Sequence, residues 1–259
     1  MLPRDEILTR VENREAIARI LDKAEQALKT WSVMLTDFLS PAILVEVLPI
    51  FKNLTELQCL AWGGYPQAER QRLGIARQEV PLTTEDWELV VLEIAGNFLF
   101  DVATHRDFLG AALGTGIVRD KIGDIIVLGE RGAQMIITPD LEEFLCTSLL
   151  QVRSVPVETK VIPLSELKIR PPKTKEMNTV EASLRLDAIA SAGFGLSRSK
   201  MAEAINSGDV RVNWKEISSA SHLLQQGDLI SFQGKGRLEV GEIQVTKKQR
   251  YRVQLTRYL

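Results

Sequence analysis

The residues best suited to chemistry form a short basic run near the C-terminus, Ser197-Arg198-Ser199-Lys200. Ser197 is typical of a helix N-cap, where free backbone N–H groups and the helix dipole attract an anion. Cations in the first helical turn cost roughly a few tenths of a kcal/mol, so Arg198 and Lys200 make better sense where a phosphate binds. The same side chains are also consistent with a solvated basic surface that has no partner.

Two further arginines are predicted to widen this basic surface. Arg185 lies on a helix expected over residues 183–192. Arg211 lies on a strand expected over residues 210–213, where alternation directs the valines to one side and Arg211 and Asn213 to the other. Cations clustered beside a helix start favour contact with the phosphates of a nucleic acid.

One tryptophan stands in a different setting from the others. Trp214 follows the predicted strand beside Lys215, in a turn where its ring could stack on a base or a ribose. Packing against the protein is equally consistent with this position. The remaining tryptophans, Trp31, Trp62 and Trp87, are expected to be in cores or partly buried rather than stacked on bases.

Two helices and two strands are expected to hold these residues. The first helix stops before the break at residues 194–196, and the second opens with the basic run. Gly208 suits the left-handed residue that ends a helix. A turn at residues 227–228 then leads to a strand over residues 229–232. The inner face of the second helix is expected to carry Met201, Ala202 and Ile205.

The net charge of −2 conceals an asymmetry along the 259 residues. Residues 1–159 carry 15 Lys and Arg against 24 Asp and Glu, a balance of −9. Residues 160–259 carry 17 against 10, a balance of +7. A basic last third on an acidic body indicates a local anion-binding surface rather than a protein that is adhesive overall.

The first third of the chain alternates helix and strand signals. Apolar residues at helical spacing predict a helix over residues 14–30, with Asn13 as its cap. A second helix is expected to begin near Pro41, with Ser40 as its cap. Residues 57–62 predict a strand that stops at a glycine pair.

The middle of the chain has the order strand, helix, strand, strand, helix, strand. These elements are expected over residues 88–94, 105–113, 125–128, 133–138, 139–150 and 157–162. Residues 129–132 are expected to form a hairpin turn, and Pro139 to open the second helix after Thr138. The order is that of the split βαβ plait, which many RNA-recognition folds share, although a fold alone gives no function. The aromatic-rich strands that stack bases in typical RNA-recognition modules are missing here.

Residues 169–178 carry two prolines and several charges and are expected to form a linker. The predicted fold class is α+β with three domains. These are an N-terminal α/β domain over residues 1–82, a plait domain over residues 83–168 and a C-terminal helix-and-strand domain over residues 179–259.

Several other classes of protein are disfavoured. No apolar run reaches the roughly 18 residues of a membrane span, and the acidic start lacks an apolar signal segment, so a cytoplasmic protein is expected. Cys59, Cys146, His105 and His222 are scattered, so neither a zinc site nor another metal site is expected. Gly114-Thr115-Gly116 follows a predicted helix, which favours a turn over a nucleotide loop, and no cofactor is expected.

The C-terminal motifs together resemble the S-four RNA-binding domain, named after a small-subunit ribosomal protein. The resemblance covers about residues 181–245, and the motifs follow in the order that is typical of the domain. They are Arg185-Leu186-Asp187, Ser197-Arg198-Ser199, Gly208-Asp209-Val210-Arg211-Val212-Asn213 and Gly227-Asp228-Leu229-Ile230.

Further motifs resemble the YlmH-type subfamily, whose cyanobacterial and plastid members are called photosystem II S-four domain proteins. They are Gly63-Gly64-Tyr65 with Ala68-Glu69-Arg70, Gly114-Thr115-Gly116-Ile117 with Ile122-Gly123-Asp124-Ile125, Gly234-Lys235-Gly236-Arg237, and Thr246-Lys247-Lys248. Gln233 departs from the pattern, because relatives often carry arginine before the glycine-rich turn. The resemblance implies a non-catalytic protein that binds the large ribosomal subunit with peptidyl-tRNA during rescue of stalled synthesis.

The expected partners are therefore structured ribosomal RNA or tRNA and the large ribosomal subunit, with neither a membrane nor DNA. The candidate RNA-binding residues are Arg185, Ser197, Arg198, Ser199, Lys200, Arg211, Asn213, Trp214, Lys215 and Arg237. The RNA target, the role of the N-terminal domain and the oligomeric state stay open.

Two alternatives accompany this interpretation. Arg185-Leu186-Asp187 is similar to the segment that carries the catalytic aspartate of pseudouridine synthases, which would make the protein an enzyme that modifies ribosomal RNA. Those enzymes usually place the S-four domain before a large catalytic domain, whereas only about seventy residues follow Asp187. The second alternative, a translation or assembly factor for photosystem II, rests on the name of the cyanobacterial relatives.

Overall fold

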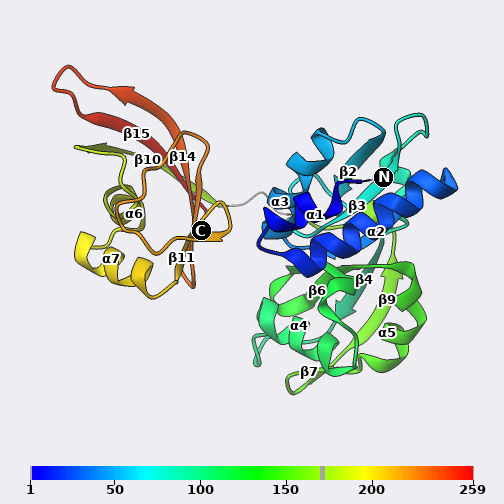
Figure 1. The fold of residues 1–259 in the computed structure, drawn as a ribbon. Coiled ribbons are helices and arrows are strands. Elements are labelled where there is room, and N and C mark those ends of the chain that lie inside the picture. Colours follow the sequence, from blue (N-terminus) through cyan, green and yellow to red (C-terminus); the bar gives the residue numbers. More distant parts are fainter. Residues whose placement is uncertain (1, 170–172, 259) are drawn as a thin grey trace. The chain divides into compact units, whose positions relative to one another are not determined.

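The computed structural model describes residues 2–169 and 173–258 of the chain. By its internal contacts the chain divides into two compact units, Met1–Ile169 and Arg170–Leu259 (Figure 1). Within the described ranges, no helix is both long enough and apolar enough to cross a membrane.

The first unit begins with helices packed on a three-stranded sheet. The helix predicted over residues 14–30 is α2, Arg14–Thr30, and its apolar stripe is buried. Asn13 stands at the predicted cap position, but its side chain donates to Glu46 Oε1 at 3.0 Å instead of capping the helix. Ser40 likewise precedes α3 without a side-chain capping bond. The elements of this part are α1 (Arg4–Thr9), α2, β1 (Met34–Leu39), α3 (Pro41–Lys52), β2 (Leu57–Trp62) and β3 (Gln71–Arg77), with sheet order β1-β3-β2.

The second half of this unit is the predicted split βαβ plait. Its four strands lie in the order β5-β6-β4-β9, and all neighbours are antiparallel. The elements are β4 (Val90–Ala95), α4 (His105–Gly114), β5 (Ile122–Val127), β6 (Gly132–Ile137), α5 (Glu142–Ser148), the short pair β7 (Gln151–Val152) and β8 (Val155–Pro156), and β9 (Glu158–Ile162). Single 3-10 turns lie at Thr84–Trp87, Arg119–Lys121, Gly129–Arg131, Pro139–Leu141 and Leu164–Glu166.

Several boundaries in the plait differ from the prediction, and β5 begins at Ile122, three residues before the predicted start at residue 125. Glu88 does not start β4, because its φ of 25° ends the preceding 3-10 turn. The helix predicted over residues 139–150 opens as a 3-10 turn at Pro139, becomes α-helical at Glu142 and stops at Ser148. It stops early because Gln151–Val152 pairs with the next strand.

A hydrogen-bonded junction joins the two halves of the first unit. Asp124 of β5 accepts three bonds from the segment before β3: from Tyr65 Oη at 2.7 Å, from the Glu69 backbone N–H at 2.8 Å and from the Arg70 backbone N–H at 3.0 Å. The Arg70 guanidinium donates to the carbonyls of Ile122 at 3.0 Å and Phe38 at 2.8 Å. The glycine-, tyrosine- and arginine-bearing motifs of this region therefore hold the fold together.

The second unit carries two helices on one face of a six-stranded antiparallel sheet. Its elements are β10 (Thr174–Glu181), α6 (Leu186–Phe194), α7 (Arg198–Asn206), β11 (Val210–Val212), β12 (Lys215–Glu216), β13 (Leu229–Phe232), β14 (Gly236–Val245) and β15 (Tyr251–Tyr258). The sheet order is β10-β15-β14-β13-β11-β12. Helix α6 lies close to β14, where a Cβ on Gly193 would come within 2.1 Å of Leu238 Cδ2.

The prediction of a linker over residues 169–178 is wrong for its second part, and residues 170–172 lie outside the described residues. Residues 174–181 form β10, which pairs with β15 along its whole length. Met177, half-buried, packs against the core of this unit while its neighbours face solvent. Such an edge strand is stabilised by a partner about eighty residues later in the chain, so local composition does not reveal it.

The first helix of this unit begins later than predicted. Residues 183–185 are not helical, and Arg185 is extended, because Leu186 N–H donates to His222 O at 2.8 Å and Leu224 N–H donates to Leu184 O at 2.8 Å. Arg185 consequently occupies the N-cap position of α6 rather than a helical turn. The inner face of α7 contains Met201 and Ile205 as predicted, whereas Ala202 is only half-buried.

Candidate nucleic-acid interface

The start of α7 has the predicted cap. Ser197 has extended backbone angles, and its Oγ accepts a hydrogen bond from the Lys200 N–H at 3.3 Å. The side chains of Arg198, Ser199 and Lys200 are exposed around this first turn. The helix dipole and the remaining N–H groups give this end of the helix a positive potential.

A buried carboxylate anchors two arginines beside this turn. Asp187, only 6% exposed, accepts bonds from Arg185 Nε at 3.0 Å and Nη2 at 3.1 Å, and from Arg198 Nη2 at 3.0 Å. Burial alone would raise the pKa of Asp187, but the hydrogen bonds and charges of the two arginines outweigh it, and the pKa is lower than usual. The carboxylate is therefore ionised at neutral pH and fixes both guanidinium groups.

This anchor provides an internal counter-charge at the helix start. The sequence pattern predicts an external anion beside Arg198, whereas Asp187 already supplies a negative charge within the protein. Two arginines against one aspartate still leave a net positive charge, and the Lys200 side chain adds to it. The Arg198 side chain is 57% exposed, so it remains accessible to an RNA phosphate.

A second group of residues lies on the opposite, outer face of the sheet. In the cross-strand register, Arg211 of β11 lies opposite Ser231 of β13, and Ser231 lies opposite Arg237 of β14. Arg237 in turn lies opposite Tyr258 of β15, so the four side chains form a row across four strands. The Arg237 guanidinium lies 5.8 Å from the ring centre of Trp214 and 5.9 Å from that of Tyr258. Trp214 is half-buried against this arginine, so part of its ring is accessible.

Asn213 differs from its predicted position. The strand ends at Val212, and Asn213 has a φ of 49° in the turn that follows. Its amide donates to Asp228 at 2.8 Å and accepts from the Leu229 N–H at 3.0 Å. The side chain therefore stabilises the turn instead of facing outward beside Arg211.

The structure thus divides the candidate residues between two surfaces. Arg185, Ser197, Arg198, Ser199 and Lys200 surround the start of α7. Arg211, Trp214 and Arg237 lie on the outer face of the sheet or at its margin, and Lys215 is exposed on β12. Sequence reasoning missed Tyr258, although the alternation of apolar residues along 251–258 is a recognisable strand signal.

Among the residues that the structure describes, no group of three or more His, Cys, Asp or Glu side chains is arranged to hold a metal ion. The described part of the site consists of cations, hydroxyls and aromatic rings on two surfaces, which are the groups that contact nucleic-acid phosphates and bases.

Both surfaces thus belong to an RNA-binding architecture, an S-four module that follows a plait. Three family models match successive parts of the chain: "YlmH, N-terminal" over residues 12–80, "Putative RNA-binding domain in YlmH" over residues 82–166 and "S4 domain" over residues 184–230. The chain belongs to the YlmH family, and the resemblance seen in the sequence is confirmed.

A curated relative, the "Ribosome-associated protein quality control protein P2" of Bacillus subtilis (strain 168), is 31% identical over 249 residues, which are 96% of each chain. The solved structure "Cell division protein ylmH from Streptococcus pneumoniae" is 22% identical and has a TM-score of 0.52. It covers 61% of this chain and 96% of that chain, and it shows a shared fold. A pseudouridylate synthase structure aligns with 22% of this chain and 27% of its own chain at 30% identity. The TM-score of 0.19 is too low to indicate a shared fold.

Proposed function

We propose that this protein is a non-catalytic RNA-binding protein that acts on structured ribosomal RNA or tRNA. Its site of action is the large ribosomal subunit in the cytoplasm, during rescue of stalled translation. The ribosome-associated quality control named for the Bacillus relative supports this role. The observation that carries the proposal is the exposed pair Arg198 and Lys200 at a capped helix start, within the segment that matches the S4 domain.

The geometry suits phosphate recognition in two ways. Asp187 holds the guanidinium groups of Arg185 and Arg198 in place, so less side-chain entropy is lost when they bind. Arginine presents a planar fork that matches phosphate oxygens, whereas Lys200 adds a flexible point charge. On the outer face, Trp214 and Arg237 offer a platform on which an unpaired base can stack.

The proposal excludes a catalytic role for Asp187. A catalytic carboxylate has to reach its substrate, but Asp187 is 6% exposed and both of its oxygens accept hydrogen bonds from arginines. These contacts support an anchoring role. A pseudouridine map of ribosomal RNA from a deletion strain tests this, because a site lost in that strain would contradict it. The photosystem-related alternative stays a prediction, which photosystem levels in the same strain would test.

Filter binding of ribosomal RNA fragments over a salt series tests the main proposal. Neutralising one phosphate contact in Lys200→Gln or Arg211→Gln should lower the slope of log affinity against log salt by ~1. Lys52→Gln, at an exposed position on the first unit, is the control of equal charge change. Unchanged salt slopes in both test variants would refute RNA binding at these surfaces. Co-sedimentation of the protein with isolated ribosomal subunits tests the assignment to the large subunit.

A further inference from the structure

A three-stranded ribbon extends beyond the part of the second unit that matches the S4 domain. That match ends at residue 230, whereas β14 and β15 pair out to Val245 and Tyr251, and β10 follows β15 to Glu181 (Figure 1). The base of the ribbon is anchored in the core by four residues that are at most 1% exposed. These are Leu238, Val240, Val253 and Leu255.

The outer half of the ribbon is less buried than its base, and Ile243 and Tyr251 pack against the core there as half-buried side chains. A register shift between Val240 and Ile243 marks an irregularity in β14 where full burial ends. Beyond it Gln244 and Val245 are exposed, and Val245 is 68% exposed although it is apolar. At ~3.3 Å per residue, the ten steps along the chain from Arg237 to position 247 span roughly 30 Å. The far end is therefore well separated along the ribbon from the Trp214–Arg237 platform.

The far end of the ribbon is strongly basic. Lys247, Lys248 and Arg250 are exposed, and every charged residue after Glu242 is a lysine or an arginine. None of the ion pairs among the described residues involves these three cations. Glu181, across the ribbon, instead accepts a hydrogen bond from a threonine hydroxyl at 2.6 Å. The tip thus concentrates positive charge without internal compensation by an ion pair.

The turn that displays these cations is well defined. The Thr246 N–H donates to Arg250 O at 2.7 Å, the Gln249 N–H donates to Thr246 O at 2.9 Å, and the Arg250 N–H donates to Thr246 Oγ1 at 3.1 Å. Gln249 takes a left-handed φ of 55°, as the third residue of a three-residue hairpin loop does. The two lysines between Thr246 and Gln249 are therefore presented from a fixed backbone.

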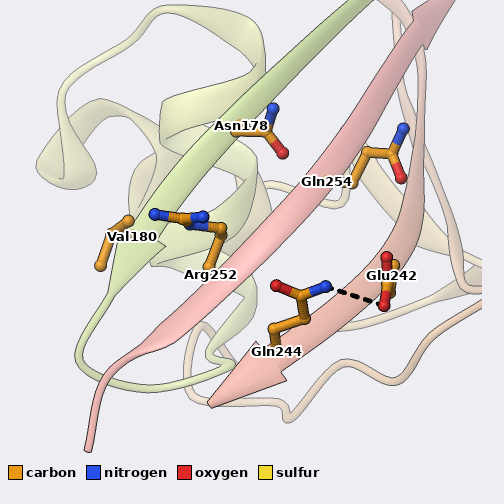
Figure 2. A pocket seen from close by; sticks show the side chains of 6 residues that line it. All are labelled: Asn178, Val180, Glu242, Gln244, Arg252 and Gln254. Carbon is orange, nitrogen blue, oxygen red and sulfur yellow. Dashed lines mark hydrogen bonds between the residues drawn. The ribbon is translucent and has the colours of Figure 1, made fainter. Parts of the chain in front are cut away.

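The outer face of the ribbon continues the polar surface from the tip. A pocket there is lined by Asn178, Val180, Glu242, Gln244, Arg252 and Gln254 (Figure 2). The Arg252 guanidinium points toward Val180 of β10, and Glu242 accepts a hydrogen bond from Gln244 at 2.9 Å (Figure 2). Amide side chains beside an arginine suit the sugar hydroxyls and phosphates of RNA rather than an apolar partner.

We propose that the tip of this ribbon, Lys247, Lys248 and Arg250, is a second RNA contact that binds phosphates of a double-stranded region distant from the Trp214–Arg237 platform. The inference rests on the proposed RNA-binding function and adds a separate surface to it. A duplex of about 16 base pairs, the length spanned by proteins that contact two successive grooves, is long enough to reach from one end of this ribbon to the other.

The experiment compares full-length variants on two RNA probes, a duplex of about 16 base pairs and a stem of about half that length. Lys247→Gln with Lys248→Gln should lower the salt slope by ~1.5 on the long duplex and leave it unchanged on the short stem. Lys29→Gln with Lys52→Gln removes the same charge from exposed positions on the first unit and is the matched control. Lys200→Gln with Arg211→Gln should lower the slope on both probes.

The outcomes separate the two proposals. The tip contact is refuted if, on the long duplex, the tip variant has the same salt slope as the Lys29/Lys52 control while the Lys200/Arg211 variant has a lower salt slope. The proposed function stands in that case. If the Lys200/Arg211 variant loses no slope on either probe, the proposed function itself fails. Equal loss by the tip variant on both probes would refute the separation of the two sites. Circular dichroism checks that each variant is folded, and the tip substitutions replace exposed residues only.

Discussion

Replacing Asp187 with asparagine should loosen the start of both helices in the second unit by a moderate, pH-dependent amount. The substitution keeps the shape of the side chain but removes its negative charge. In the native chain this carboxylate accepts three hydrogen bonds from Arg185 and Arg198. A fully buried ion pair broken on one side would cost about 3–5 kcal/mol. Here the arginine side chains are 38% and 57% exposed, so water can solvate them after the change. The expected loss is therefore about 1–2 kcal/mol.

The pH dependence follows from the direction of the pKa shift. The folded protein holds the pKa of Asp187 below its ordinary value of 3.8. A lowered folded-state pKa gives stability that is complete above the unfolded pKa and is lost as the pH falls through the folded value. The difference between the native chain and Asp187→Asn should thus be full at neutral pH and vanish at the acid end of the titration.

Hydrogen exchange by mass spectrometry in the full chain measures this local stability, because peptides over 184–206 report opening of α6 and α7 separately from the first unit. Glu203→Gln is the matched control, since it makes the same charge change at an exposed position on α7. Equal exchange in Asp187→Asn and the control at neutral pH would refute the anchoring role. A difference that persists undiminished in acid would refute the electrostatic explanation.

Three further predictions concern the packing, two of them with paired substitutions and one with a thiol. Asp124→Asn should destabilise the first unit by about 2–3 kcal/mol in urea unfolding, because it disturbs three hydrogen bonds at the junction. Asp120→Asn is the control. It breaks only an ion pair whose aspartate is 59% exposed and should cost under about 1 kcal/mol. Gly193→Ala should cost about 1–3 kcal/mol of thermal stability by overpacking, whereas Gly110→Ala, with open space around it, should stabilise α4 by up to about 1 kcal/mol. Burial raises the pKa of the Cys59 thiol to about 11, so its alkylation at mildly alkaline pH should be far slower in the folded chain than in urea; equal rates would contradict this.

The plait could be predicted from the sequence because its signals are local. Each strand is a short apolar run, each helix has a helical stripe, and the order alone defines the topology that the sheet order confirms. The start of α7 was predictable for the same reason, since Ser197 and the following residues form a cap within one turn. Signals confined to a few neighbouring residues depend little on the rest of the chain.

The features that sequence reasoning missed depend on distant partners. The linker prediction fails for β10, because the partner of this strand, β15, lies some eighty residues later in the chain. Asn213 was placed on a strand face, but its amide binds Asp228 across a turn. The three bonds of Asp124 to the segment before β3 cross more than fifty residues. Such contacts are set by tertiary packing, which overrides local pattern.

The junction at Asp124 also bears on how the chain can be cut and recombined. Two family models meet near residue 81, yet the bonds at Asp124 and a shared apolar cluster that includes Phe38, Trp87 and Ile136 cross this boundary. A fragment that ends there would leave the Arg70 guanidinium without its carbonyl partner on β5. In chimeras with relatives, the first two modules should accordingly be exchanged as one cassette, whereas a crossover at the boundary between the two units leaves these contacts intact.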